Sequence, residues 1–175
     1  MTSETNPARV FLSLGSNIEP EKNLPAAVRE LERFGSVLRV SQVWQTAPVG
    51  WTDQSDFLNA AVLLETNLTA QQFRAVAIAA IESRLGRVRD PDNKNAPRTI
   101  DIDIALYNDD IIESEGRKIP DPDILTRPFV AATLAELDPE RVHPETGESL
   151  RRIATKLQAS APAMTLRSDV QLAPK

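Results

Sequence analysis

Residues 100–104 read Ile-Asp-Ile-Asp-Ile, and no other segment of this chain restricts its fold as strongly. Successive side chains of a β-strand point to opposite faces, so a strand would place the three isoleucines on one face and both aspartates on the other. Two aspartates on one strand face repel each other, and Asp is disfavoured in strands. A bound cation would relieve both penalties. A polar face exposed to water is the alternative, and this segment alone does not decide between them.

Strand-like and helix-like patterns alternate along the rest of the chain. Residues 57–65 alternate cleanly, with Leu58, Ala60, Val62 and Leu64 on one face. Strands are expected at 9–14, 37–44, 57–65 and 99–107, with weaker signals at 111–112 and around 119; helices are expected at 23–34, between 69 and 86, at 128–137 and after 149. This order predicts an α+β, ferredoxin-like β-α-β-β-α-β sandwich, whose mainly antiparallel sheet carries helices on its faces.

Local signals mark the ends of the first two helices. Asn23 is a candidate N-cap of the first helix, and Gly35 suits the C′ position that follows it. Thr69 and Gln72 have the spacing of a capping box, which places the start of the second helix, and Gly86 can end it. Both helices are therefore expected to have defined boundaries.

The length of 175 residues suits one domain, about 70% of whose unfolded surface is buried on folding. Residues 1–8 are polar and are expected to be flexible. Residues 9–157 are expected to form the single domain, and residues 158–175 a loose C-terminal tail. No linker or internal repeat divides the chain.

The chain has no cysteine and only one histidine, His143. A disulfide framework, a thiol nucleophile and a cysteine-ligated metal are therefore impossible, and so is a multi-histidine metal site. Any metal must be a hard cation on carboxylate oxygens. His143 lies in a Val-His-Pro sequence that suggests a surface turn, and no catalytic role is expected for it.

The net charge of −5 argues against a nucleic-acid partner or an acidic membrane surface. No apolar run approaches the roughly 18 residues of a membrane span, and the polar start does not resemble a signal peptide. A soluble, cytoplasmic protein is therefore expected.

Basic residues gather directly before the paired aspartates. Between residues 84 and 98 five basic side chains oppose two acidic ones, which leaves +3 in an acidic protein. These are Arg84, Arg87, Arg89, Lys94 and Arg98, against Asp90 and Asp92. Arginine binds phosphate oxygens in a bidentate manner, and Mg²⁺ is normally held by one or two carboxylates together with substrate phosphates. The combination indicates a metal–polyphosphate site, although a solvated loop with internal ion pairs is the alternative for any single arginine.

Nucleotide motifs built on glycine loops are absent, which argues against P-loop and Rossmann enzymes. Phe57 and Asn59 share a strand face, where an aromatic ring beside an amide would suit a flat heterocycle; a core Phe is the alternative. The role of Trp51, in a polar loop, stays open between a lid and a packing anchor.

The sequence resembles the 6-hydroxymethyl-7,8-dihydropterin pyrophosphokinase family of folate biosynthesis. The resemblance covers about residues 9–157, and the P-R-T-x-D-x-D element is its most specific part. The segments that carry it are FLSLGSN (11–17), TAPVG (46–50), DFLNAAVLLET (56–66), ESRLGRVR (82–89), APRTIDIDIALYNDDII (96–112) and IPDPDILTRPFVAATLAELDPE (119–140).

The resemblance implies a ferredoxin-like enzyme that transfers the β,γ-diphosphate of ATP to the pterin's hydroxymethyl oxygen and releases AMP. Asp101 and Asp103 would then bind two Mg²⁺ ions that bridge the triphosphate. Arg89 and Arg98 would clamp the ATP phosphates, and the resemblance implies that they are catalytic together with the two aspartates. The other implied ATP-binding residues are Arg127, Asp121 and, as a weaker candidate, Arg87. The implied pterin-binding residues are Asn17, Thr46, Pro48, Val49, Phe57, Asn59 and Phe129. A monomer is expected, with the loops 87–97 and 50–55 as lids.

The chain departs from the family's usual pattern at a few positions. Asp121 stands where a phosphate-contacting His is common, and Asn95 stands where a Trp often precedes the P-R-T element. An acidic side chain at 121 would repel phosphate unless it turns away or helps to hold metal. Phe57 is often Tyr, a mild change.

Two further readings stay open. One is a weak or inactive ferredoxin-like paralogue that still binds pterin or nucleotide, supported by Asp121 and Asn95. The other is a two-metal nucleotidyl enzyme on a similar sheet, such as a cyclase or a polymerase palm. The acidic charge argues against a polymerase, and the ring-pocket residues argue against a cyclase.

Overall fold

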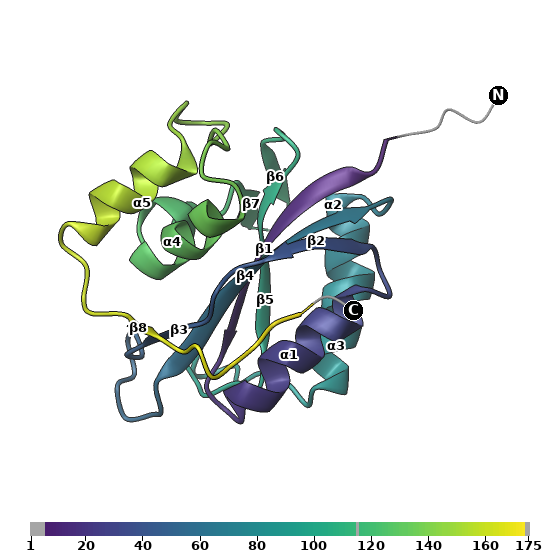
Figure 1. The fold of residues 1–175 in the computed structure, drawn as a ribbon. Helices are drawn as coiled ribbons and strands as arrows, with labels where there is room; N and C mark the ends of the chain where they lie inside the picture. Colours follow the sequence, from purple (N-terminus) through teal and green to yellow (C-terminus); the bar gives the residue numbers. More distant parts are fainter. Residues whose placement is uncertain (1–5, 115, 174–175) are drawn as a thin grey trace.

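An antiparallel sheet forms the centre of the computed structural model, which describes residues 6–114 and 116–173 (Figure 1). Its strands follow the order β5-β1-β4-β3-β8, and β2 pairs with another part of β4. They are β1 (Ala8–Ser16), β2 (Ser36–Val40), β3 (Trp44–Thr46), β4 (Phe57–Thr66), β5 (Asp101–Tyr107) and β8 (Thr165–Leu166). A separate hairpin is made by β6 (Ile112–Ser114) and β7 (Arg117–Ile119).

The predicted fold class is confirmed. The first helix connects β1 to β2, and a second helical run connects β4 to β5. This reproduces the β-α-β-β-α-β order if β2 and β3, which both pair with β4, are counted as one strand. The strand predicted at 37–44 is in fact two strands. At the interruption the Ser41 hydroxyl, rather than a backbone carbonyl, accepts the hydrogen bond from Ala61 N at 2.7 Å.

Helices cover both faces of the sheet (Figure 1). One face carries α1 (Pro20–Leu31) and a continuous helical run composed of α2 (Ala70–Gln72), the π-helical η1 (Phe73–Ile78) and α3 (Ala79–Arg84). The other face carries α4 (Pro128–Leu137) and α5 (Leu150–Gln158), and the short 3-10 helix η2 (Pro122–Leu125) precedes α4. None of the helices within the described ranges is long and apolar enough to cross a membrane.

The alternation of β4 divides its side chains between two cores, as predicted. Leu58, Ala60, Val62 and Leu64 pack in the core under α1 and α3, and Ala61 and Leu63 pack in the core under α4. The isoleucines of residues 100–104 likewise all lie in the first core. Both aspartates of that segment consequently point to the α4 side of the sheet.

The predicted capping box is present, with Gln72 N donating to Thr69 Oγ1 and Thr69 N donating to Gln72 Oε1. The first helix begins earlier than predicted, with Glu19 at the N-cap. Asn23 lies inside it, and its Nδ2 donates to Ile18 O at 2.7 Å. Gly35 also has a different role, because a Cβ there would collide with the Glu65 carbonyl. A close approach of two backbones, not a left-handed turn, requires this glycine.

Two expectations about the chain ends and His143 need correction. Thr165–Leu166 forms β8 against β3, and Val170 and Leu172 are buried in the first core, so these residues of the predicted loose tail are ordered by apolar packing. At the N-terminal end, residues 1–5 lie outside the described residues, and Ala8 already pairs with Thr66. His143 is 1% exposed rather than in a surface turn, and its Nδ1 accepts from Glu145 N.

Candidate active site

The α4 side of the sheet is covered over only part of its length. Phe11, Ala61, Leu63 and Ala105 lie under α4 and α5, and polar or small residues continue the same face toward one end. There Ser13 pairs with Asp103, and Gly15 pairs with both Asp101 and Asn59. Strand register alone therefore brings together residues that are up to 90 positions apart in the sequence.

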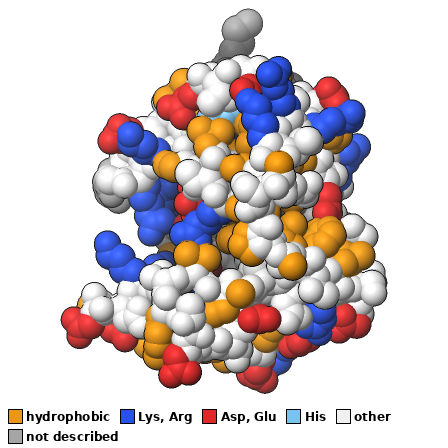
Figure 2. Space-filling model, turned by 90° about the vertical axis from the view of Figure 1, so that its left-hand side faces the viewer, with side chains coloured by type: hydrophobic (Ala, Val, Ile, Leu, Met, Phe, Trp, Pro, Cys, Tyr) orange, Lys and Arg blue, Asp and Glu red, His pale blue; other side chains and the backbone are white. Residues whose placement is uncertain are grey.

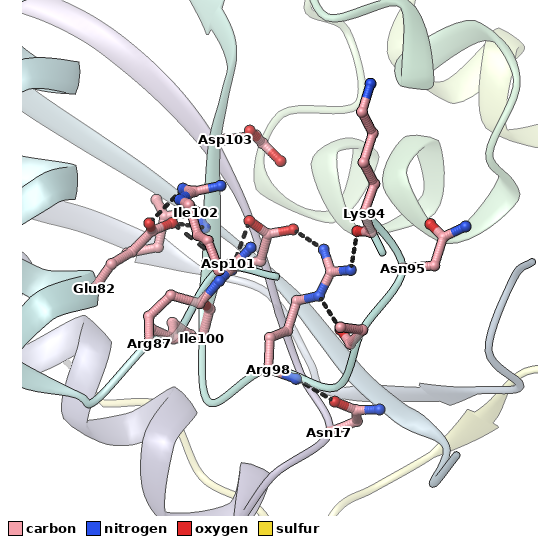
Figure 3. A network of polar contacts seen from close by, with 12 residues as sticks. Asn17, Glu82, Arg87, Lys94, Asn95, Arg98, Ile100, Asp101, Ile102 and Asp103 are labelled. Atoms are coloured by element: carbon pink, nitrogen blue, oxygen red, sulfur yellow. Dashed lines mark hydrogen bonds and ion pairs between the residues drawn. The ribbon is translucent and has the colours of Figure 1, made fainter. Parts of the chain in front are cut away.

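Two arginines hold the first aspartate (Figure 3). Asp101 Oδ1 accepts from Arg87 Nη1 at 2.9 Å, and Asp101 Oδ2 accepts from Arg98 Nη1 at 2.7 Å. Burial alone would raise the pKa of Asp101, but the charges and hydrogen bonds of Arg87 and Arg98 outweigh it and lower the pKa. Asp101 is therefore a carboxylate at neutral pH.

The second aspartate is in an opposite electrostatic environment. Burial, followed by the charges of Asp101 and Asp121, raises the pKa of Asp103 to about 7. Its cationic partner is Arg117, whose Nη1 lies 3.2 Å from Asp103 Oδ1 and whose side chain is half exposed. An extra cation beside Asp103 would lower this pKa, because it would stabilise the ionised form.

The predicted arginines take different partners. Arg87 is almost fully buried and also donates to Ile100 O at 2.5 Å, and its Nε has no hydrogen-bond partner among the described residues. Arg89 instead pairs with Glu82, with 2.6 Å between Nη2 and Oε2. Arg87, the weaker candidate in the sequence, thus reaches Asp101 together with Arg98, whereas Arg89 pairs with Glu82.

Sequence reasoning did not single out Glu82 or Arg117. Glu82 is 6% exposed, and its Oε1 accepts from Ile102 N, between the two aspartates. Glu82 could have been found from the sequence, because it is an acidic residue on the buried side of a helix and several arginines follow it closely. No comparable signal exists for Arg117, because only the packing of the β6–β7 hairpin brings it to β5.

A basic hollow lies on one side of the aspartates. Figure 2 shows Lys and Arg side chains gathered beside a hollowed part of the surface in which acidic side chains are visible. The charged residues that line this hollow are Arg87, Arg89, Asp90, Lys94, Arg98, Asp101, Asp103 and Arg117. The predicted basic loop and the predicted aspartates therefore do share one cavity wall.

A second hollow lies on the other side of the aspartates and has a different lining. Its wall contains most of the predicted ring-binding residues, namely Thr46, Val49, Phe57, Asn59 and Phe129. Asn59 is 4% exposed, and its Nδ2 donates to Thr46 Oγ1 at 2.8 Å, which fixes the plane of the amide. Arg98 lies over the Phe57 ring, 5.6 Å from its centroid. Asp101, Asp103 and Arg98 line both hollows.

Asn17 and Pro48, predicted to bind the ring, do not line this hollow. Asn17 joins two loops instead: its Oδ1 accepts from Arg98 N at 2.8 Å, and its Nδ2 donates to Gln54 Oε1 at 2.7 Å. Gln54 in turn donates to Asn95 O. The two predicted lid loops are therefore in contact with each other.

The remaining predicted residues lie at the start of α4 and η2. Asp121, Arg127 and Phe129 line the second hollow together with Asp123, which the sequence did not single out. Asp121 Oδ1 accepts from Asp123 N at 2.9 Å, and burial raises the pKa of Asp121. Arg127 Nε lies 3.0 Å from Asp123 Oδ2. Within the described ranges, no group of three or more His, Asp or Glu side chains is arranged to hold a metal; the candidate is the aspartate pair.

The aspartate pair lines both a basic hollow and a hollow with aromatic and amide side chains, an arrangement that suits an enzyme class acting on a phosphate-bearing substrate and a flat polar ring. The chain belongs to the 7,8-dihydro-6-hydroxymethylpterin-pyrophosphokinase (HPPK) family, whose model matches residues 11–139. The family's name describes transfer of a pyrophosphate group to a hydroxymethyl pterin, so the resemblance found in the sequence is confirmed.

Two bacterial relatives match most of their own length. The 2-amino-4-hydroxy-6-hydroxymethyldihydropteridine pyrophosphokinase of Bacillus subtilis is 40% identical over 130 residues, which is 73% of this chain and 76% of that protein. The enzyme of the same name from Aquifex aeolicus is 34% identical, and the match covers 78% of this chain and 84% of that protein. The folic acid synthesis protein fol1 of Pneumocystis carinii is 36% identical over 85% of this chain, but the chain spans only about 20% of that longer protein.

The fold also resembles solved structures. A crystal structure of Plasmodium falciparum HPPK-DHPS has a TM-score of 0.71 at 16% identity, and the match covers 89% of this chain and 46% of that one. This likeness supports the ferredoxin-like fold of an HPPK domain.

Proposed function

We propose that the chain transfers the β,γ-diphosphate of ATP to the hydroxymethyl oxygen of 6-hydroxymethyl-7,8-dihydropterin and releases AMP, as a step of folate biosynthesis. The observation that carries the proposal is the position of Asp101 and Asp103 between a basic hollow and an aromatic one. A phosphate donor and a flat acceptor bound in these two hollows would meet at the aspartates.

The residues fit a divalent cation. Two carboxylates lie on one strand face, and burial, followed by the negative charges of Asp101 and Asp121, raises the pKa of Asp103. Mg²⁺ accepts carboxylate and phosphate oxygens, so Asp101 and Asp103 would hold it, as two ions when ATP is present. Bound Mg²⁺ would supply neutralisation of the triphosphate charge. Asp121 would add to the same negative field.

The arginines would hold the triphosphate in the basic hollow. Arg87 and Arg98 donate to the two oxygens of Asp101 and also line the basic hollow. Their guanidinium groups therefore lie between the carboxylate and the proposed triphosphate position. Arg89, from its pair with Glu82, would exchange a carboxylate for phosphate oxygens in this hollow. Arg127 lines the second hollow and would bind phosphate oxygens from that side, in exchange for its exposed pair with Asp123.

The acceptor would occupy the aromatic hollow. Phe57 and Phe129 line this hollow with aromatic rings. Asn59 donates its amide N–H groups to Thr46 Oγ1 and Trp44 O, which leaves its Oδ1 as an acceptor for the polar edge of a pterin. Arg98 covers Phe57 in this structure and would leave the ring as the pterin enters.

The reaction conserves all groups without a further reactant. The hydroxymethyl oxygen bonds to the β-phosphorus, the bond from that phosphorus to the α–β bridging oxygen breaks, and AMP departs with the bridging oxygen. The hydroxyl proton passes to solvent. Positioning and charge neutralisation are the main tasks left to the protein.

One observation favours the weaker-activity alternative. Asp121 points a partly buried carboxyl group into the cavity that also holds Asp103, and its charge would oppose a triphosphate. A paralogue that binds ligands with little turnover is thus the second candidate. We further propose that the protein acts as a monomer in the cytoplasm.

Replacing the metal-binding carboxylate tests the proposal. We expect Asp103→Asn to lower AMP formation at least about 100-fold, because one metal-binding charge is lost, while the fold persists by circular dichroism. Asp110→Asn is the matched control, since Asp110 is exposed and outside both hollows. Equal turnover of Asp103→Asn and the control would remove the support for this site.

A further inference from the structure

The C-terminal strap, residues 165–172, lies beside the ring-binding end of the sheet although it is outside the residues that the family model matches. β8 pairs with β3 through Leu166 opposite Trp44 and Thr165 opposite Gln45, and Arg167 N donates to Val43 O at 2.9 Å. In Figure 1 the strap runs from α5 past β3 toward α1. A strand of only three residues, β3, is thus paired on both edges.

The strap is anchored independently of these contacts. Val170 and Leu172 are each 8% exposed and belong to the core under α1. Arg167 Nη2 also lies 3.1 Å from Glu21 Oε1 in the first turn of α1. The strap therefore links β3 to a rigid helix rather than to another loop.

Two routes connect the strap to residues of the ring pocket. The first runs through β3 itself, because Thr46, its last residue, accepts from the Asn59 amide and fixes its orientation. The second runs through Gln45, whose Oε1 accepts from Arg167 Nη1 at 3.1 Å and whose Nε2 donates to Asp56 Oδ2 at 2.8 Å. Asp56 directly precedes Phe57.

We propose that the C-terminal strap positions the ring-binding corner of the site: it holds β3 and the start of β4 so that Thr46, Asn59 and Phe57 keep the arrangement that binds the pterin. Arg167 is the positioning residue, and it acts through Gln45 without touching the substrate. The identity of the ligand in this proposal rests on the proposed function. The packing of the strap against β3 does not depend on that function.

The test uses Arg167→Met in the full chain, which keeps most of the aliphatic stem and removes the hydrogen bonds. We expect the Kd for the pterin to rise roughly fivefold to tenfold, since charge-assisted hydrogen bonds are lost, while the Kd for ATP with Mg²⁺ changes less than about twofold. Arg151→Met is the matched control, because Arg151 pairs with Glu140 on the surface, away from the pocket. Arg167→Lys should restore part of the pterin affinity.

Amide hydrogen exchange of the ligand-free variant provides a second readout. Protection of residues 44–46 and 57–59 should fall in Arg167→Met, and protection of β1 and β5 should not change. Unchanged exchange at β3, or an equal loss of affinity for both ligands with a lower unfolding midpoint, would overturn the positioning role. If the unaltered protein binds no pterin, the proposed function fails, and hydrogen exchange alone decides whether the strap holds β3.

Discussion

Two aspartates on one strand differ in charge state because their neighbours differ. Asp101 has two arginines on its two oxygens and a lowered pKa, whereas partly buried Asp103 has the charges of Asp101, Asp121 and Glu82 nearby and one half-exposed arginine. The raised pKa of Asp103 has a consequence for stability. Between about pH 4 and pH 7 the folded protein binds more protons than the unfolded chain, so this residue reduces stability as the pH rises through that window.

Asp103→Asn should therefore stabilise the metal-free protein more at pH 8 than at pH 5, each compared with the unaltered protein at the same pH. We expect a gain of about 1–2 kcal/mol in the free energy of unfolding, smaller than the full pKa shift implies because the Asp103 side chain is 40% exposed. Urea unfolding in EDTA at the two pH values measures it. An identical effect at pH 5 and pH 8 would show that Asp103 has an ordinary pKa.

Removal of Asp101 should have the opposite effect on stability. Asp101→Ala removes the nearer carboxylate of Arg87, whose side chain is 8% exposed, and leaves it Glu82 at 3.9 Å; we expect a loss of about 2–4 kcal/mol. The control is Asp123→Ala, whose pair with Arg127 is 44% and 40% exposed and should cost less than about 1 kcal/mol. Thermal unfolding of both variants checks this, and equal losses would contradict the assignment of Asp101 as the partner of buried Arg87.

At this scale the sequence predicts on which strand face four of the candidate site residues lie. Asp101, Asp103, Asn59 and Phe57 lie on strands with clear alternation, so their faces follow from their neighbours. Arg117 could not be predicted, because its approach to Asp103 depends on how a separate hairpin packs.

At the scale of the elements, periodic segments were predictable and non-periodic ones were not. The strand β4 and the helix α1 have repeats long enough to define a face. The strand β8 has two residues, and no repeat can mark it. Its formation depends on the pairing with β3 and on the burial of Val170 and Leu172, which are long-range effects.

Gly35 tests the close packing of the turn after α1 against β4. Gly35→Ala should cost more than about 2 kcal/mol, because the new Cβ would overlap the Glu65 carbonyl and a backbone would have to move. Gly86→Ala is the comparison: its φ is +72°, no atom lies within 4 Å of the added Cβ, and a cost of about 1 kcal/mol is expected. Denaturant midpoints measure both. A Gly35 variant no less stable than the Gly86 variant would contradict this packing.

For the whole molecule, the sheet order and the two cores explain why the site lies where it does. The face of β1, β4 and β5 that supports α4 is apolar under the helices and polar beyond them, so its polar part lies at one end of the sheet among the described residues. The order of the patterns in the sequence predicts this architecture. The contact of the two lid loops through Gln54 and Asn95 could not be predicted, because single loop hydrogen bonds leave no pattern.

The central claim is that the two hollows bring ATP and a hydroxymethyl dihydropterin together at Asp101 and Asp103. The most direct measurement is product analysis of the purified chain incubated with ATP, Mg²⁺ and 6-hydroxymethyl-7,8-dihydropterin. We expect AMP and the pterin diphosphate in equal amounts, both dependent on the pterin and abolished by EDTA. Formation of ADP, or of no nucleotide product, would contradict it.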